Sequence, residues 1–121
     1  MTRFDKIMGN ETEVNERKIL KLVLDDGEDI RKCIEQGMKD NNLKDANVVE
    51  IVGNLKNATI DSKEGRLEFE NIEFVNAKGK FKIGGGDLWG AIEVFTSQKK
   101  PIAGKLLKAT ASQDVEIHLE I

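Results

Sequence analysis

One stretch of this chain has the spacing of an amphipathic helix, and most of the sequence after it alternates with the period of a strand. Ile30, Cys33, Ile34 and Met38 recur at intervals of three or four residues, which places them on one stripe of a helix. A single helix cannot supply the crossovers that a parallel sheet needs. The pattern therefore predicts an α+β domain, a mainly antiparallel β-sheet with one principal helix packed on it.

The expected strands are runs in which apolar residues alternate with polar ones. These runs cover residues 17–26, 46–61, 65–76, 87–97 and 114–121. Gly53 interrupts the second run and indicates a bulge or a close backbone approach. The alternation slips by one at Asn71, which indicates another bulge. The sequence predicts turns at Lys78-Gly79-Lys80, at residues 84–86 and at residues 98–104, which include the only proline.

The length of 121 residues favours one domain, and we expect a polar N-terminal segment at residues 1–15 followed by a single domain at residues 16–121. Residues 1–15 lack the apolar run of a signal peptide, and no window of the chain resembles a transmembrane span. Cys33 is the only cysteine, so no internal disulfide forms, and we expect it to pack as a small hydrophobic residue. These features lead us to expect a soluble, cytoplasmic protein without membrane partners.

The charge of the chain is acidic overall but unevenly distributed. It has 22 acidic residues against 19 basic ones, so the overall basic charge typical of non-specific nucleic-acid binding is absent. Residues 76–108 nevertheless contain seven lysines against two acids. The candidate nucleic-acid-binding residues in this stretch are Lys78, Lys80, Lys82, Lys99, Lys100 and Lys108. The alternative is that these lysines are solvated strand faces, and the absence of arginine from the stretch argues against sequence-specific base reading.

Motifs for cofactors and catalysis are missing from the sequence. Lys105 follows Gly104 as in a phosphate-binding loop, but Gln98 or Lys99 stands where the first glycine belongs and Leu106 replaces the required hydroxyl. The only histidine, His118, lies on the polar face of the last expected strand beside Glu116, where a surface or interface role is favoured over a zinc site. We therefore expect no cofactor and no metal, and an enzymatic role is the less favoured alternative.

The segment from Arg17 to Ile60, with its "LDDGEDI" turn and its "EIVGNLKNATI" stretch, resembles the plant-and-prokaryote-conserved (PPC) domain family. Gly53 corresponds to the second glycine of a family "GxG" pattern whose first glycine is missing here. The family's "GGHL" motif is matched by Ala103-Gly104-Lys105-Leu106. The similarity covers residues 16–121.

This resemblance implies a small α+β fold, similar to that of acetolactate decarboxylase, and a homotrimer. Prokaryotic members are often described as predicted DNA-binding proteins, and plant members carry AT-hooks, which this chain lacks. Many members also carry a His-x-His pair and a third histidine that look like a metal site. The resemblance places these three histidines at Trp89, Ala91 and Lys105 of this chain, so the metal site and decarboxylase-like chemistry should both be absent.

Two functions remain open from the sequence. The first is a non-catalytic homotrimeric PPC-like module that binds DNA or mediates assembly, with the apolar strand at residues 115–121 expected at a sheet edge that a neighbouring subunit covers. The second is a protein or enzyme that binds a small anionic ligand in a pocket at Trp89, Ala91 and Lys105, the place of the family metal. The role of His118 stays undecided.

Overall fold

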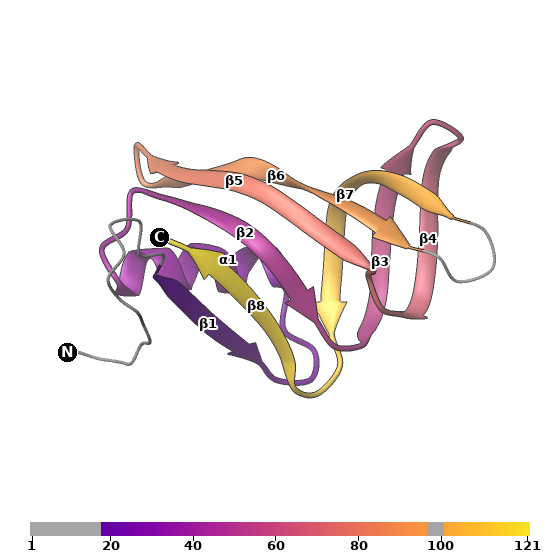
Figure 1. Cartoon of the computed structure of the whole chain (residues 1–121), viewed down its shortest axis with the longest axis horizontal. Coiled ribbons are helices and arrows are strands. Elements are labelled where there is room, and N and C mark those ends of the chain that lie inside the picture. Colours follow the sequence, from indigo (N-terminus) through magenta and orange to yellow (C-terminus); the bar gives the residue numbers. More distant parts are fainter. Residues whose placement is uncertain (1–17, 97–100) are drawn as a thin grey trace, which may run out of the picture.

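The computed structural model describes residues 18–96 and 101–121, which form one helix and eight strands (Figure 1). In chain order the elements are β1 (Ile19–Leu24), α1 (Ile30–Asp40), β2 (Asp45–Val52), β3 (Leu55–Ser62), β4 (Gly65–Ile72), β5 (Asn76–Gly84), β6 (Asp87–Thr96), β7 (Ile102–Ala111) and β8 (Val115–Glu120). Of the part of the chain that is described, no helix has the length and apolar character that crossing a bilayer requires.

All eight strands belong to one antiparallel sheet in the order β1-β8-β2-β5-β6-β7-β3-β4. This confirms the α+β class with one helix. The strand order also corrects one expectation: β8 pairs with β1 on one side and β2 on the other, so the C-terminal strand lies inside the sheet and not at its edge. The sheet edges are β1 and β4.

Helix α1 forms where the apolar stripe predicts it. The Asp29 side chain caps its start by accepting a hydrogen bond of 2.9 Å from the backbone N–H of Lys32. Asn41 ends it, and its backbone N–H bonds the carbonyl of Gly37. Ile34 and Met38 are fully buried against the sheet, and the stripe therefore sets which side of the helix faces inward.

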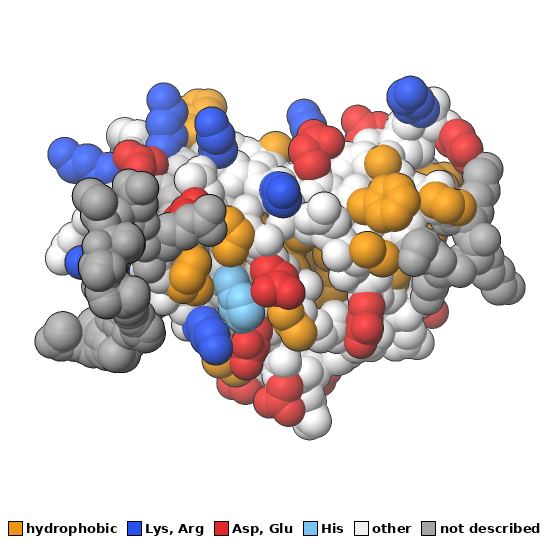
Figure 2. Space-filling model, viewed as in Figure 1, with side chains coloured by type: hydrophobic (Ala, Val, Ile, Leu, Met, Phe, Trp, Pro, Cys, Tyr) orange, Lys and Arg blue, Asp and Glu red, His pale blue; other side chains and the backbone are white. Residues whose placement is uncertain are grey.

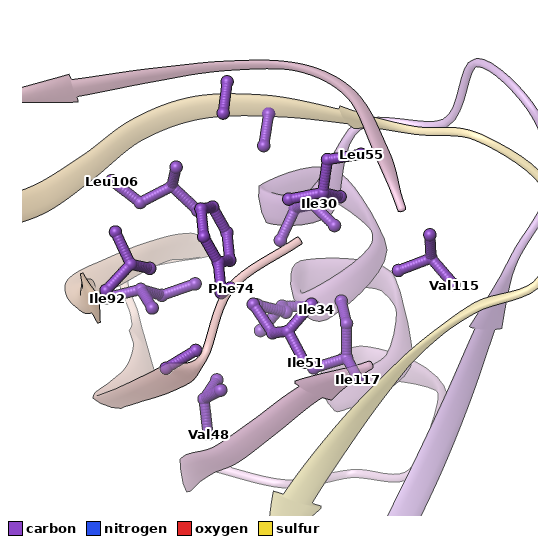
Figure 3. Close-up of a cluster of buried hydrophobic side chains, with 14 of the residues drawn as sticks. Ile30, Ile34, Val48, Ile51, Leu55, Phe74, Ile92, Leu106, Val115 and Ile117 are labelled. Atoms are coloured by element: carbon purple, nitrogen blue, oxygen red, sulfur yellow. The ribbon is translucent and has the colours of Figure 1, made fainter. Parts of the chain in front are cut away.

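The core lies between α1 and the concave face of the sheet. Figure 3 shows Ile34 of the helix next to Ile51 of β2 and Ile117 of β8, and Ile30 next to Leu55 of β3. Some neighbouring strands around this core pair over only part of their length. The β2–β5 ladder stops at Val48↔Gly79, and the β6–β7 ladder stops at Ile92↔Leu106.

Several local predictions need correction. Residues Lys78-Gly79-Lys80 form no turn but lie inside β5. Gly79 is needed there because the backbone of β6 approaches closely, and a Cβ on this residue would collide with the carbonyl oxygen of Ala91. The turn falls instead at Gly85-Gly86, where both residues have positive φ, within the predicted 84–86 connection.

The long run at residues 46–61 is two strands, β2 and β3, with Gly53 between them. Gly53 has a φ of +117°, and a Cβ there would lie 3.1 Å from Cα of Val115, so the predicted close approach is confirmed. Asn71 has a left-handed φ of 53°, and the alternation of inward and outward side chains changes there. The β3–β4 register shows no shift, so the predicted bulge is wrong.

Strand β7 was not predicted, and the expected turn at residues 98–104 is wrong for Ile102–Gly104, which belong to this strand. Residues 98–100 of that turn lie outside the described residues, as does the N-terminal segment 1–15. Lys105, which directly follows the expected turn, therefore lies inside a strand of the sheet.

Candidate functional site

The face of the sheet opposite α1 carries the candidate residues. Along β5, Lys78, Lys80 and Lys82 are exposed and alternate with the buried Ala77 and Phe81, so all three lysines point to this outer face. Figure 2 shows basic side chains gathered at the upper left, where Figure 1 places the tip of the β5–β6 hairpin. The strand period thus brings three of the candidate lysines together.

The remaining candidate lysines do not join this group. Lys108 lies on β7 beyond the last β6–β7 pair and faces Thr59 of β3 in register. Lys99 and Lys100 lie outside the described residues.

A row of alternating charges crosses five strands of the outer face. Cross-strand neighbours in this row are Lys78 of β5, Glu93 of β6, Lys105 of β7, Asp61 of β3 and Arg66 of β4. Opposite charges at directly paired positions stabilise a sheet modestly. Lys105 therefore has a carboxylate as its paired neighbour on each side, and its positive charge is balanced across the sheet.

Lys80 and Lys82 have different surroundings. Lys80 faces Asn47 on one side and Ala91 on the other, so no charged residue is paired with it. Lys82 faces Asp45 and Trp89. A groove of about 450 Å³ opens here, lined by Asp45, Asn47, Lys80, Phe81, Lys82, Trp89 and Gly90. The groove thus combines two ammonium groups with an exposed indole and one carboxylate.

Trp89 is 57% exposed, yet its ring is held in place. The indole N–H donates a hydrogen bond of 3.1 Å to the carbonyl of Gly84. A Cβ on Gly84 would lie 3.6 Å from two atoms of the indole, so the ring packs over this glycine. The glycine-rich turn thus fixes one edge of the indole and leaves much of the ring in solvent.

Of the predicted pocket residues Trp89, Ala91 and Lys105, Trp89 lines the groove of about 450 Å³. Ala91 is half-buried, and neither it nor the exposed Lys105 lines the groove beside Trp89. An indole, a methyl group and an ammonium group offer a metal ion no ligand at neutral pH. Within residues 18–96 and 101–121, no group of three or more His, Cys, Asp and Glu side chains is arranged to hold a metal.

Arg31 is a residue that the sequence did not single out. From the first turn of α1 it donates hydrogen bonds to the carbonyls of Gly90 (2.9 Å) and Leu88 (3.2 Å). Its guanidinium also lies 5.5 Å from the ring centroid of Phe81. Arg31 thereby fixes the strand segment that carries Trp89, and no local pattern distinguishes it from any exposed helix residue.

His118 lies between two carboxylates on the β1–β8–β2 part of the outer face. Its Nε2 is 2.9 Å from Oε1 of Glu116, and its Nδ1 is 3.2 Å from Oε1 of Glu50. The ring donates to both carboxylates when both nitrogens are protonated. The hydrogen bond from His118 lowers the pKa of the Glu116 carboxyl below its usual value, and the nearby charge of Lys21 acts in the same direction. This arrangement joins adjacent strands and leaves no imidazole nitrogen free for a ligand.

Cys33 packs against the core from α1, as expected. Burial raises the pKa of its thiol to about 11, with smaller contributions from the negative charges of Glu28 and Asp29. A thiol with so high a pKa is a poor nucleophile at neutral pH, which argues against a catalytic role for this residue.

A second groove, of about 410 Å³, opens where β2 and β5 separate beyond Val48 and Gly79. Val52 and Val75 line it, and both are exposed. The backbone N–H of Val75 donates a hydrogen bond to the carbonyl of Phe95, whose side chain is also exposed. These three exposed residues, Val52, Val75 and Phe95, are called the apolar cluster below. Figure 2 shows hydrophobic side chains around a hollow in this part of the face.

Several solved structures share this fold. A "putative DNA-binding protein" from Ralstonia eutropha JMP134 is 18% identical, with a TM-score of 0.70 over 83% of this chain and 75% of that one. A plant- and prokaryote-conserved (PPC) protein from Pyrococcus horikoshii is 16% identical, with a TM-score of 0.67 over 90% and 83%. A metal-containing protein from Archaeoglobus fulgidus is 20% identical, with a TM-score of 0.64 over 94% and 84%.

A family model matches most of the sequence. The model described as the Plants and Prokaryotes Conserved (PCC) domain matches residues 11–120. No curated protein matches the chain.

Proposed function

Because this chain belongs to the Plants and Prokaryotes Conserved (PCC) domain family, we propose that it is a non-catalytic binding module of the cytoplasm, formed by residues 16–121, that assembles as a homotrimer and binds DNA. The family resemblance supports the trimer, and the DNA-binding description of the Ralstonia eutropha protein supports the ligand. The observation that carries the proposal is the set of outward lysines on β5, Lys78, Lys80 and Lys82.

DNA binding through these lysines would be electrostatic and largely independent of sequence. Each lysine that contacts a phosphate releases counterions, so affinity should fall steeply as salt rises. Fluorescence anisotropy with a labelled duplex at low salt tests this, using a Lys78→Gln, Lys80→Gln, Lys82→Gln triple variant. The control is Lys63→Gln, which removes a charge from the β3–β4 turn. Binding should weaken in the triple variant only, and absence of binding at low salt would refute the proposal.

The apolar cluster of Val52, Val75 and Phe95 is our candidate for the trimer contact. All three side chains are exposed, and Val75 is 64% exposed. Val75→Asp should therefore leave the monomer folded and shift the mass measured by light scattering from trimer to monomer. Val23→Asp is the matched control, since Val23 is 59% exposed on the edge strand β1 and outside the cluster. A clean monomer of the native protein at micromolar concentration would refute the trimer.

We further propose that the metal site of the family is absent here, because Trp89, Ala91 and Lys105 stand in place of its three histidines. The alternative of an anionic ligand at Lys105 is weakened by the carboxylates of Glu93 and Asp61 in register on either side. A thermal-shift screen with phosphate and small carboxylates tests this alternative. Stabilisation that disappears in Lys105→Ala would favour it over the DNA-binding module.

A further inference from the structure

The proposed function does not explain why the exposed Trp89 lies beside Lys80 and Lys82 on the outer face. The indole lies over Gly84, yet Trp89 remains 57% exposed. Its hydrogen bond to the Gly84 carbonyl restricts its rotation. A fixed and exposed aromatic ring offers a flat partner for stacking at a low entropic cost.

The charges beside the ring favour an anionic partner. Lys82 is paired with Trp89 on one side and Asp45 on the other, and Lys80, which has no charged paired neighbour, lies at the next outward position along β5. Within residues 18–96 and 101–121, neither lysine forms an ion pair with a carboxylate. Paired side chains on one face start about 5 Å apart, and diagonal ones about 7–8 Å apart. Long lysine side chains at these positions can reach a phosphate whose base lies on the indole.

From this arrangement we propose that Trp89, Lys80 and Lys82 form a platform for single-stranded nucleic acid, in which an unpaired base stacks on Trp89 and the lysines contact the adjoining phosphates. A ring lying on a sheet surface can stack only on a base whose face is free, as in a single strand and not in an intact duplex. Asn47 on the groove wall adds an amide that can hydrogen-bond a base edge. The inference rests on the proposed DNA-binding function and specifies its ligand and its contact residues.

Trp89 is the only tryptophan, so its fluorescence reports on this site alone. Titration with an oligothymidylate should quench the emission as a base stacks on the ring. In anisotropy measurements with the labelled oligonucleotide, Trp89→Leu should weaken binding about tenfold or more, and Trp89→Phe should retain much of the affinity. Lys80→Gln should lower the slope of log affinity against log salt by about 0.7, while Lys63→Gln leaves both slope and quenching unchanged.

The possible outcomes separate this inference from the proposed function. If duplex and single strand both bind without quenching, and Trp89→Leu binds as well as the native chain, the platform is refuted and DNA binding stands. If neither form binds at low salt, the proposed function fails and the platform with it. If thymidine monophosphate quenches as effectively as the oligonucleotide at equal concentration, the site takes single nucleotides and the polynucleotide assignment is overturned. Circular dichroism of Trp89→Leu and Trp89→Phe establishes that both variants are folded.

Discussion

Arg31 donates a hydrogen bond of 2.9 Å from Nη1 to the carbonyl oxygen of Gly90, across a sequence separation of 59 residues. Strand β7 pairs only with residues 92–96 of β6, so within the described residues the carbonyls of Leu88 and Gly90 have no paired strand on that side. The guanidinium of Arg31 bonds both carbonyls in place of a strand. The start of α1 is thereby fixed to the segment that presents Trp89.

Replacing Arg31 with alanine should therefore destabilise the fold. Loss of two charge-assisted hydrogen bonds and of the contact with the Phe81 ring should reduce the free energy of unfolding by about 1–2 kcal/mol. Urea unfolding with an unchanged m-value measures the effect. Lys32→Ala, one position along the same helix, should change stability by less than about 0.5 kcal/mol. Equal losses in the two variants would contradict the bridging role of Arg31.

Gly90→Ala should be among the most damaging changes in the sheet. Gly90 has a φ of +138°, and a Cβ there would collide with the carbonyl of Lys80 and approach the Phe81 ring to 2.8 Å. Backbone strain and overpacking each cost about 1–3 kcal/mol, so we expect a loss of at least about 3 kcal/mol. Gly65→Ala is the control, because its φ of +106° brings strain but its surroundings are open. A loss in Gly90→Ala no greater than in Gly65→Ala would refute the clash.

Lys105→Glu should destabilise the outer face through its paired neighbours. The change sets a third carboxylate between Glu93 and Asp61 and should cost roughly 1 kcal/mol. Lys105→Gln removes the attraction without adding repulsion and should cost less. The difference between the variants should shrink as salt screens the exposed charges. Chemical unfolding at two salt concentrations measures this, and a salt-independent difference would argue against an electrostatic cause.

The thiol of Cys33 should react slowly with iodoacetamide in the folded protein. A pKa of about 11 lowers the thiolate fraction at pH 8 roughly 100-fold, and the greater nucleophilicity of a more basic thiolate recovers about tenfold of this. We expect a reaction about tenfold slower than in the urea-unfolded chain, with the rate still rising with pH near pH 10. A plateau in the rate below pH 9 would show that burial does not raise the pKa of the thiol.

The pair of His118 and Glu116 should contribute to stability in a pH-dependent way. Because folding lowers the pKa of Glu116, the contribution is present above the unfolded pKa of about 4.3 and is lost as pH falls through the lower folded value. The stability difference between the native chain and His118→Val should therefore decrease between about pH 5 and pH 3. Glu116→Gln should remove the same pH dependence of the stability. The double variant with His118→Val and Glu116→Gln should remove no more of it than either single variant. Parallel acid curves for the native chain and Glu116→Gln would contradict the coupling.

Part of the hairpin that carries Trp89 was accessible from the sequence. The glycines at 84–86 predicted a connection between two strands, and a two-residue turn at Gly85-Gly86 sets Lys82 opposite Trp89 by counting back from the turn. The β5–β6 register was not predicted, because a turn expected at Gly79 divided the segment that forms β5. Local preference alone does not show that Gly79 is needed for close packing against Ala91, since a glycine in a turn and a glycine in a tight strand pair look alike.

The sequence by itself determined the single helix, its buried stripe, the two faces of most strands and the family, because periodicity and capping residues act over short distances along the chain. It did not determine which strands pair, because alternation specifies the face of a strand and carries no information on its neighbour. The tertiary structure therefore decided that β8 lies inside the sheet, that Arg31 bonds the carbonyls beside Trp89, and that Lys105 lies between two carboxylates on an open face. Each of these depends on pairings between segments far apart in sequence, where the burial of one shared core selects the arrangement.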